Sequence, residues 1–289
     1  MTTREQWIAG ARPKTLPAAI APVLVGTSFA GYNATFLHTL LALIVALSLQ
    51  VGVNFANDYS DGIKGTDADR VGPMRLVGSG AATPDAVKKA AFLSFFIASL
   101  AGLILASRTS WFLVALGTLC ILAAWTYTGG PKPYGYQALG EVSVFIFFGV
   151  VATVGTYYVQ TESISREVLL ASFAMGALAC AILVLNNLRD LDKDQLSQKK
   201  TLAVVMGDKE TRNFYKWLMF FALVMSVALT FFSFYYLLAL IALPLVSKSV
   251  RAVTSGASGT ALIDLLAKTG RIQIIYAVAL SFAAWLVAR

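Results

Sequence analysis

Charged residues are scarce in this chain of 289 residues: they make up 13% of it, whereas hydrophobic residues make up 57%. Soluble domains contain about 25% charged residues, so this composition indicates an integral membrane protein. The chain has a single histidine, His38, and two cysteines, Cys120 and Cys180, all within apolar runs. The scarcity of nitrogen and sulfur ligands argues against a zinc site and against hydrolysis by a serine–histidine pair.

Long apolar runs are abundant, and nine of them are long enough to cross a bilayer as helices. They predict an all-α integral membrane fold with nine transmembrane helices around a central cavity. Residues 1–289 then form a single membrane-embedded domain, with helices near 15–33, 37–56, 89–107, 110–128, 139–159, 167–187, 213–232, 234–250 and 271–288.

The positive charge is distributed unevenly along the chain. A net charge of +8 can indicate nucleic-acid binding, but here the basic residues gather in alternate loops. With the N-terminus in the cytoplasm, all but Arg108, Arg166 and Arg289 of the 23 Lys and Arg residues face the cytoplasm. This asymmetry is typical of multi-pass membrane proteins. We therefore expect a protein of the bacterial cytoplasmic (inner) membrane that contacts lipid and no nucleic acid.

Two polar segments, 54–61 and 186–194, stand at the ends of the second and sixth apolar runs. On a helix, residues three or four apart share a face, which groups one Asn with two Asp in each segment. The groups are Asn54, Asp58 and Asp61, and Asn186, Asp190 and Asp194. Neighbouring carboxylates repel and are costly near a bilayer, so we expect a divalent cation between them. Their positions four runs apart predict an internal repeat of four-helix units with a ninth helix appended.

The residue types in these segments favour magnesium and phosphate. Mg²⁺ prefers oxygen ligands and is usually bound by one or two carboxylates plus substrate phosphates. Because the surrounding helices are apolar, the predicted substrate is a diphosphate with a lipid tail. Pyrophosphate leaves such a substrate when metal and cations neutralise the developing charge. The candidates for contacts with the diphosphate are Asn54, Asn57, Lys64, Arg75, Lys132, Asn187, Arg189, Lys199 and Lys200.

Several of these positions also allow a second interpretation. The long connection 58–88 is either a lid over the acidic site or a solvated loop. Lys199 and Lys200 either contact phosphate or belong to a solvated positive surface. Glu141 either stabilises the first turn of its helix or takes part in the site.

Four segments together resemble those of the UbiA superfamily of intramembrane prenyltransferases, and in particular its menaquinone-pathway members. They are Arg12-Pro13-Lys14-Thr15-Leu16-Pro17, Asn54-x-x-Asn57-Asp58-Tyr59-x-Asp61-x-x-x-Gly65-x-Asp67, Pro133-Tyr134-Gly135-Tyr136-x-x-Leu139-Gly140-Glu141 and Asn186-Asn187-x-Arg189-Asp190-x-x-x-Asp194. The resemblance covers essentially the whole chain. It departs from the family pattern at Gly65, where many relatives have a third acid, and by one extra residue between Tyr127 and Lys132.

The resemblance implies Mg²⁺-dependent transfer of a polyprenyl chain from polyprenyl diphosphate to 1,4-dihydroxy-2-naphthoate. Pyrophosphate and carbon dioxide are released, and the product is demethylmenaquinone. The implied catalytic residues are Asp58, Asp61, Asp190 and Asp194. The implied metal ligands are these four with Asp67 and Asn54, and the candidates for acceptor binding are Arg12, Lys14, Tyr127 and Tyr134.

Two other functions fit parts of this pattern. A related enzyme of the same superfamily would use another acceptor, such as 4-hydroxybenzoate or haem. A divalent-cation or anion transporter would place its acidic clusters near the middle of the membrane on broken helices. Here both acidic segments lie at helix ends toward one face, which favours the prenyltransferase.

Overall fold

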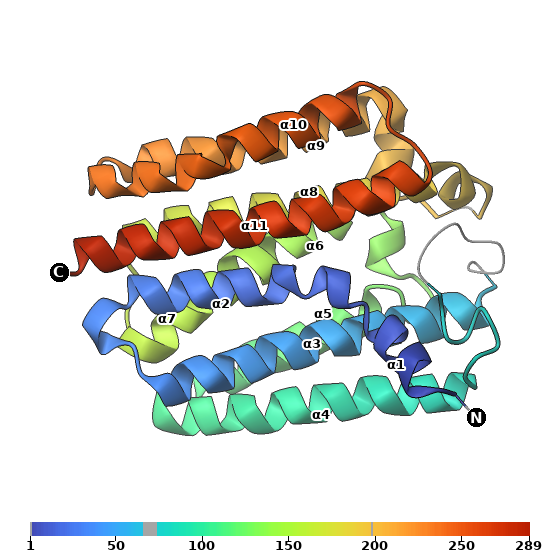
Figure 1. Cartoon of the computed structure of the whole chain (residues 1–289). Coiled ribbons are helices and arrows are strands. Elements are labelled where there is room, and N and C mark those ends of the chain that lie inside the picture. The colour runs from blue at the N-terminus through green and yellow to red at the C-terminus, as the bar shows by residue number, and fades with distance from the viewer. Residues whose placement is uncertain (1, 66–73, 198) are drawn as a thin grey trace.

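The computed structural model describes residues 2–65, 74–197 and 199–289, and Asp67 lies outside this part of the chain. Within the described residues the regular elements are helices, apart from one isolated β-bridge between Gln137 and Lys200. The long helices run roughly along one direction (Figure 1). The ends of α3 and α8 lie at the same end of the molecule as α1, and the connection between α2 and α3 lies at the other (Figure 1).

Eleven α-helices and five short 3₁₀ or π segments follow one another along the chain. The α-helices are α1 (Arg4–Ala11), α2 (Pro17–Phe29), α3 (Phe36–Ile63), α4 (Pro84–Arg108), α5 (Phe112–Thr126), α6 (Gly140–Val144), α7 (Ala152–Thr161), α8 (Arg166–Leu196), α9 (Leu202–Leu229), α10 (Leu243–Thr254) and α11 (Thr260–Val287). The shorter segments are η1 (Pro13–Thr15), η2 (Gly31–Asn33), η3 (Tyr134–Tyr136), the π-helical η4 (Phe145–Val151) and η5 (Phe234–Ala242).

Hydroxyl side chains mark the starts of several helices. Thr35, Thr83, Ser165 and Thr201 stand just before α3, α4, α8 and α9, and each accepts a hydrogen bond from a backbone N–H of the first turn. Such caps supply partners for amide groups that have none inside the helix. The caps thus fix the residue at which each of these helices begins.

In the part of the chain that the structure describes, six helical stretches are long and apolar enough to cross a membrane, so the chain is a multi-pass membrane protein. They are Phe36–Ile63, Pro84–Arg108, Gly140–Thr161, Arg166–Leu196, Phe234–Thr254 and Thr260–Val287. The apolar helices α2 and α5 are shorter, with 13 and 15 residues. The first half of α9 carries several charges, including Lys209 and Arg212. The count of nine spans and the internal repeat therefore stay predictions.

Two helices extend well beyond the apolar runs that predict them. The second and sixth runs end near residues 56 and 187, whereas α3 continues to Ile63 and α8 to Leu196. An apolar run ends where the bilayer ends, but backbone hydrogen bonding continues into water as long as the residues favour a helix. Both polar segments therefore lie on rigid helix and not in the loops that follow.

α8 is the most enclosed of the spanning helices. Buried residues make up 78% of its most apolar stretch, compared with 22% in α3, so α8 lies in the middle of the bundle. Small residues allow close packing on it: an added Cβ at Gly149 of η4 would lie 2.5 Å from the Cα of Gly176 in α8. Such close approach is typical of helix pairs in membranes. It places η4 directly against α8 and along one wall of the site.

Candidate active site

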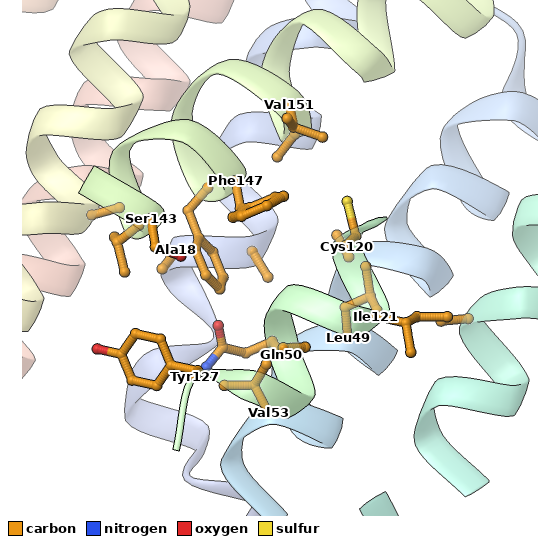
Figure 2. A pocket seen from close by; sticks show the side chains of 18 of the residues that line it. Ala18, Leu49, Gln50, Val53, Cys120, Ile121, Tyr127, Ser143, Phe147 and Val151 are labelled. Atoms are coloured by element: carbon orange, nitrogen blue, oxygen red, sulfur yellow. The ribbon is translucent and has the colours of Figure 1, made fainter. Parts of the chain in front are cut away.

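A cavity of about 520 Å³ lies between α2, α3, α4, α5, the segment 140–161 and α8. On α3 its wall runs from Ala42 to Asp61, which corresponds to roughly 28 Å along a helix. Most of the wall is apolar, and side chains of Leu49, Val53 and Phe147 surround a common space with Tyr127 (Figure 2). Polar groups gather where α3 and α8 reach their polar segments. The cavity thus joins a polar end to a long apolar channel.

The face that α3 presents to the cavity is a helical stripe. Over residues 50–63 it consists of Gln50, Val53, Asn54, Asn57 and Asp61, each three or four residues from another of them. The stripe differs from the predicted grouping of Asn54 with Asp58 and Asp61. Asp58 lies beyond its edge, because the loop after α3 folds back against that side of the helix.

Asp58 anchors this returning loop. It is fully buried and accepts hydrogen bonds from the backbone N–H groups of Leu76, at 2.8 Å, and Val77, at 3.0 Å. Leu76 in turn packs in a cluster with Phe55. Both oxygens of Asp58 are therefore engaged with the loop, and Asp58 is not part of the cavity wall.

Asp58→Asn is expected to destabilise the protein. The amide keeps the shape of the carboxylate but turns an NH₂ group toward one of the two backbone donors, which costs about 1–3 kcal/mol for a buried group. A thermal melt in detergent should show the loss, while part of the turnover remains at low temperature. An unchanged melt combined with complete loss of turnover would instead indicate direct metal binding by Asp58.

Asp61 is the acidic residue of α3 that faces the cavity. It is 2% exposed, accepts a hydrogen bond from the hydroxyl of Tyr136, and lies 3.6 Å from the guanidinium of Arg75. Arg75 also belongs to the cavity wall. The polar end therefore has the negative charge of Asp61 beside the guanidinium of Arg75, a cation suited to binding phosphate.

The turn between α1 and α2 places Arg12 at the cavity. Arg12 has a left-handed backbone conformation (φ 54°, ψ 67°), which costs a non-glycine residue of the order of 1 kcal/mol. The amide of Asn54 holds this turn by donating to the carbonyl of Ala11 at 2.9 Å and to Thr15 Oγ1 at 3.1 Å. Asn54 thus lines the cavity and also braces the residue that brings a guanidinium to it.

α8 contributes Asn186 and Asn187 to the opposite wall. Asn187 Nδ2 donates to Glu141 Oε1 at 2.9 Å, which turns the amide oxygen away from Glu141. The guanidinium of Arg189 donates to Asn186 Oδ1 at 2.9 Å and to both oxygens of Asp190, at 2.8 and 2.6 Å. Glu141 therefore orients the side chain of Asn187, and Arg189 orients that of Asn186, although neither Glu141 nor Arg189 lines the cavity.

The segment after α8 places the ammonium group of Lys199 at the site. Lys199 belongs to the cavity wall and lies 4.0 Å from a carboxylate oxygen of Asp194. Its backbone N–H donates to the carbonyl of Asp194 at 2.9 Å, which closes a tight turn. Lys200, the next residue, is exposed and pairs through its backbone with Gln137.

The structure brings many of the predicted site residues to one cavity. Those in its wall are Arg12, Asn54, Asn57, Asp61, Arg75, Tyr127, Tyr134, Asn187 and Lys199. Those placed outside the wall are Lys14, Asp58, Lys64, Lys132, Arg189, Asp190, Asp194 and Lys200. Of the latter, the acids and Arg189 stand behind the wall, whereas Lys14, Lys64, Lys132 and Lys200 are exposed.

The hydroxyl of Tyr134 serves the structure of the wall. It donates to the carbonyl of Ala123 at 2.9 Å and lies 2.9 Å from Ser143 Oγ. Burial raises the pKa of Tyr134, and the hydrogen bond with Ser143 opposes this shift. The hydroxyl therefore stays protonated and joins α5 to α6.

Two more residues take part in the site: Tyr136, which is outside the predicted set, and Glu141, for which the sequence leaves a site role open. Tyr136 contacts Asp61, and Glu141 contacts Asn187. Glu141 is 5% exposed, and its second oxygen Oε2 has no hydrogen-bond partner among the residues that the structure describes. Glu141 follows a Gly-Pro-rich loop at the start of an apolar run, so the sequence signals an acid at a helix start but not its contact.

The oxygen donors at the polar end suit a hard cation. Asp61, Asn57, Asn186 and Asn187 offer carboxylate and amide oxygens, which Mg²⁺ prefers. Over residues 2–65, 74–197 and 199–289, no three acidic, His or Cys side chains form a group that could hold a metal by themselves. The donor set thus fits a metal ion that takes some of its ligands from the protein and the others from a phosphate substrate. It does not fit a metal ion enclosed entirely by protein ligands.

A family model and known proteins match most of this chain in sequence. The family model described as the UbiA prenyltransferase family matches residues 19–261. A protein of Mycobacterium tuberculosis named 1,4-dihydroxy-2-naphthoate octaprenyltransferase is 48% identical over 97% of this chain and 97% of its own length. A protein of Escherichia coli with the same name is 38% identical over 92% of this chain and 90% of its own length.

Solved structures share the fold at low sequence identity. A UbiA homolog from Archaeoglobus fulgidus, bound to DMAPP and Mg²⁺, has a TM-score of 0.68 and 13% identity over 97% of this chain and 99% of the other. The apo structure of a UbiA homolog from Aeropyrum pernix has a TM-score of 0.74 and 15% identity over 93% and 97%.

Proposed function

The chain belongs to the UbiA prenyltransferase family, and we propose that it transfers a polyprenyl chain from polyprenyl diphosphate to 1,4-dihydroxy-2-naphthoate. Pyrophosphate and carbon dioxide are released, and demethylmenaquinol, the reduced form of demethylmenaquinone, is formed. The observation that carries the proposal is the cavity between α3 and α8, whose cationic, oxygen-rich end continues into a long apolar channel. A diphosphate with a lipid tail likewise consists of a charged, oxygen-rich end and a long apolar part. The names of the relatives with 48% and 38% identity support the acceptor.

In this proposal the polar end binds the diphosphate of the donor. Asp61 and Asn57 from α3 and Asn187 from α8 would hold Mg²⁺ together with phosphate oxygens. Bound there, the metal supplies charge neutralisation of the departing pyrophosphate. Arg75 and Lys199 bind the remaining phosphate oxygens, and Arg can do so bidentately. Asp190 and Asp194 stand behind them and keep the net charge of this end balanced.

The apolar channel binds the prenyl tail and holds the reacting carbon away from water. Aromatic side chains of Tyr127 and Phe147 face this space and can stabilise positive charge that develops at the carbon that loses pyrophosphate. Arg12, fixed by its braced turn, offers a guanidinium to the carboxylate of the acceptor. These positions bring the acceptor ring and the donor carbon to the same end of the cavity.

The proposed setting is the bacterial cytoplasmic membrane. With the N-terminus in the cytoplasm, the polar end of the cavity lies toward the cytoplasmic face, as the distribution of Lys and Arg favours. α2, α5 and α9 complete nine spans with the six longer helical stretches. The polar segments on α3 and α8 then occupy corresponding places in two four-helix units of one domain over residues 1–289.

Purified protein in detergent or lipid, supplied with a polyprenyl diphosphate and 1,4-dihydroxy-2-naphthoate, tests this function. We expect a prenylated, decarboxylated product by mass spectrometry, formed with Mg²⁺ and not with excess chelator. Parallel reactions with 4-hydroxybenzoate and haem identify the acceptor. Product from one of these alone would overturn the assigned acceptor but keep the prenyl transfer, and no product from any would overturn both.

The positions of two glycines predict where the far end of the bound prenyl tail lies. Gly117 of α5 and Gly155 of α7 belong to the cavity wall toward the end opposite the polar segments, and an added Cβ at either meets no atom within 4 Å. Gly117→Leu or Gly155→Leu should fill part of the channel without straining the helix, since Leu favours a helix more than Gly does. We expect kcat/KM for an octaprenyl donor to fall about tenfold relative to geranyl diphosphate.

Competition between the long and short donors, followed by mass spectrometry, measures this ratio. Ala115→Leu is the matched control, because Ala115 is an exposed residue of α5 outside the cavity wall. The same ratio in the glycine variants and in the control would mean that the tail does not reach this part of the cavity.

A further inference from the structure

The connection between α5 and α6 is tied to the segment that follows α8. The backbone N–H of Ala138 donates to the carbonyl of Lys200 at 2.7 Å, and Gln137 forms a β-bridge with Lys200. The N–H of Gly135 donates to the carbonyl of Tyr127 at 2.9 Å, which closes the connection on itself. Tyr136 therefore stands on a backbone held from both sides.

The side chain of Tyr136 contacts one residue of the polar segment of α3 and one residue that follows each of the two polar segments. Its ring centroid lies 4.9 Å from Nζ of Lys64 and 4.9 Å from Nζ of Lys199. Its hydroxyl donates to Asp61. Lys64 follows the polar segment of α3, Lys199 follows that of α8, and Lys199 also pairs with Asp194. One aromatic residue thus links two cations and the carboxylate that faces the cavity.

We infer that Tyr136 is a positioning residue for the diphosphate site, in which the ring places the two lysines and the hydroxyl orients Asp61. This inference rests on the proposed function, because it assumes that the ligand of the polar end is a diphosphate. An ammonium within about 6 Å of an aromatic centroid is attracted to the ring face, and the attraction is stronger where water is partly excluded.

The two ammonium groups lie near the same ring and repel each other. Partial burial lowers the pKa of Lys64; the carboxylate of Asp61 opposes this shift, and the nearby ammonium of Lys199 adds to it. Lys64 also donates to the carbonyl of Thr128 at 2.7 Å, so its direction is fixed. A diphosphate bound near both cations would relieve their repulsion, and the ring holds them ready for it.

The two functions of Tyr136 can be separated by substitution. Tyr136→Phe keeps the ring and removes the hydroxyl, so the Mg²⁺ concentration for half-maximal activity should rise severalfold while KM for the donor changes less than twofold. Tyr136→Leu removes the ring as well, so KM for the donor should rise about tenfold. KM for the acceptor should stay the same in both, because neither substitution alters the acceptor site.

Titration calorimetry with inorganic pyrophosphate and Mg²⁺ on detergent-purified protein, without any acceptor, gives the second readout. We expect affinity near that of the wild type in Tyr136→Phe and about tenfold weaker in Tyr136→Leu. Tyr32→Leu is the control, since Tyr32 is 84% exposed and belongs to η2, in the connection between α2 and α3 at the other end of the molecule.

Wild-type affinity in Tyr136→Leu, or a parallel change of both KM values and the melting temperature, would overturn the positioning role of Tyr136. Absence of pyrophosphate binding by the wild-type protein would instead overturn the diphosphate site, and the proposed function with it. Because the titration contains no acceptor, a wrong acceptor leaves its result unaffected.

Discussion

Asp61→Asn is expected to lower turnover by roughly 10²–10³-fold, the loss typical of removing one electrostatic group from a reaction centre. Asp61 is the acid of α3 whose side chain faces the cavity, and it stands 3.6 Å from Arg75. Asn keeps the volume and one oxygen but removes the charge that holds Mg²⁺ beside the diphosphate. Release of pyrophosphate, followed by a coupled assay over a range of Mg²⁺ concentrations, measures the effect.

Two substitutions serve as controls for Asp61→Asn. Asp192→Asn changes an exposed acid of α8 outside the cavity wall and should leave turnover unchanged. Asp58→Asn changes an acid of the same segment and should affect stability more than turnover. A melting temperature that falls more in Asp61→Asn than in Asp58→Asn would assign Asp61 a structural role and contradict this part of the account.

Asp190→Asn is expected to lower turnover by a similar factor and also to destabilise the protein. Asp190 accepts both hydrogen bonds of a bidentate pair with Arg189, whose side chain is 3% exposed. Removing one charge of a buried pair leaves the other without compensation, which costs about 3–5 kcal/mol. Thermal melts and pyrophosphate release measured on the same preparations give both effects.

The double variant Arg189→Gln with Asp190→Asn separates the two roles of Asp190. It removes both charges, so most of the stability should return. If Asp190 supplies charge to the metal site, turnover stays low although the protein is stable. Recovery of turnover together with stability would mean that Asp190 only neutralises Arg189.

The sequence predicts the helices well because bilayer thickness fixes the length of an apolar run. It predicts less well where helices end, since α3 and α8 continue for several residues beyond the apolar runs. It also treats Asp58 and Asp61 alike. Only the path of the later loop separates them, because the backbone N–H groups that engage Asp58 come from Leu76 and Val77, nearly twenty residues away.

The cations near the site show the same limit. Arg12 and Lys14 stand two residues apart in one basic segment, yet Arg12 lines the cavity and Lys14 is exposed. The left-handed backbone of Arg12 and its bracing by Asn54 decide this difference, and neither leaves a signal in composition or spacing. Tyr136 is missed for a similar reason, since its contacts join three segments that are distant in the chain.

The central claim is that α3 and α8 bind one diphosphate through shared Mg²⁺ at the polar end of the cavity. An experimental structure with Mg²⁺ and a non-reactive polyprenyl diphosphate analogue tests it most directly. The account predicts a diphosphate in contact with Asp61 and Arg75 on one side and with Asn187 or Lys199 on the other, its tail running toward Gly155. A diphosphate that touches only one of the two helices, or that lies outside the cavity, would contradict it.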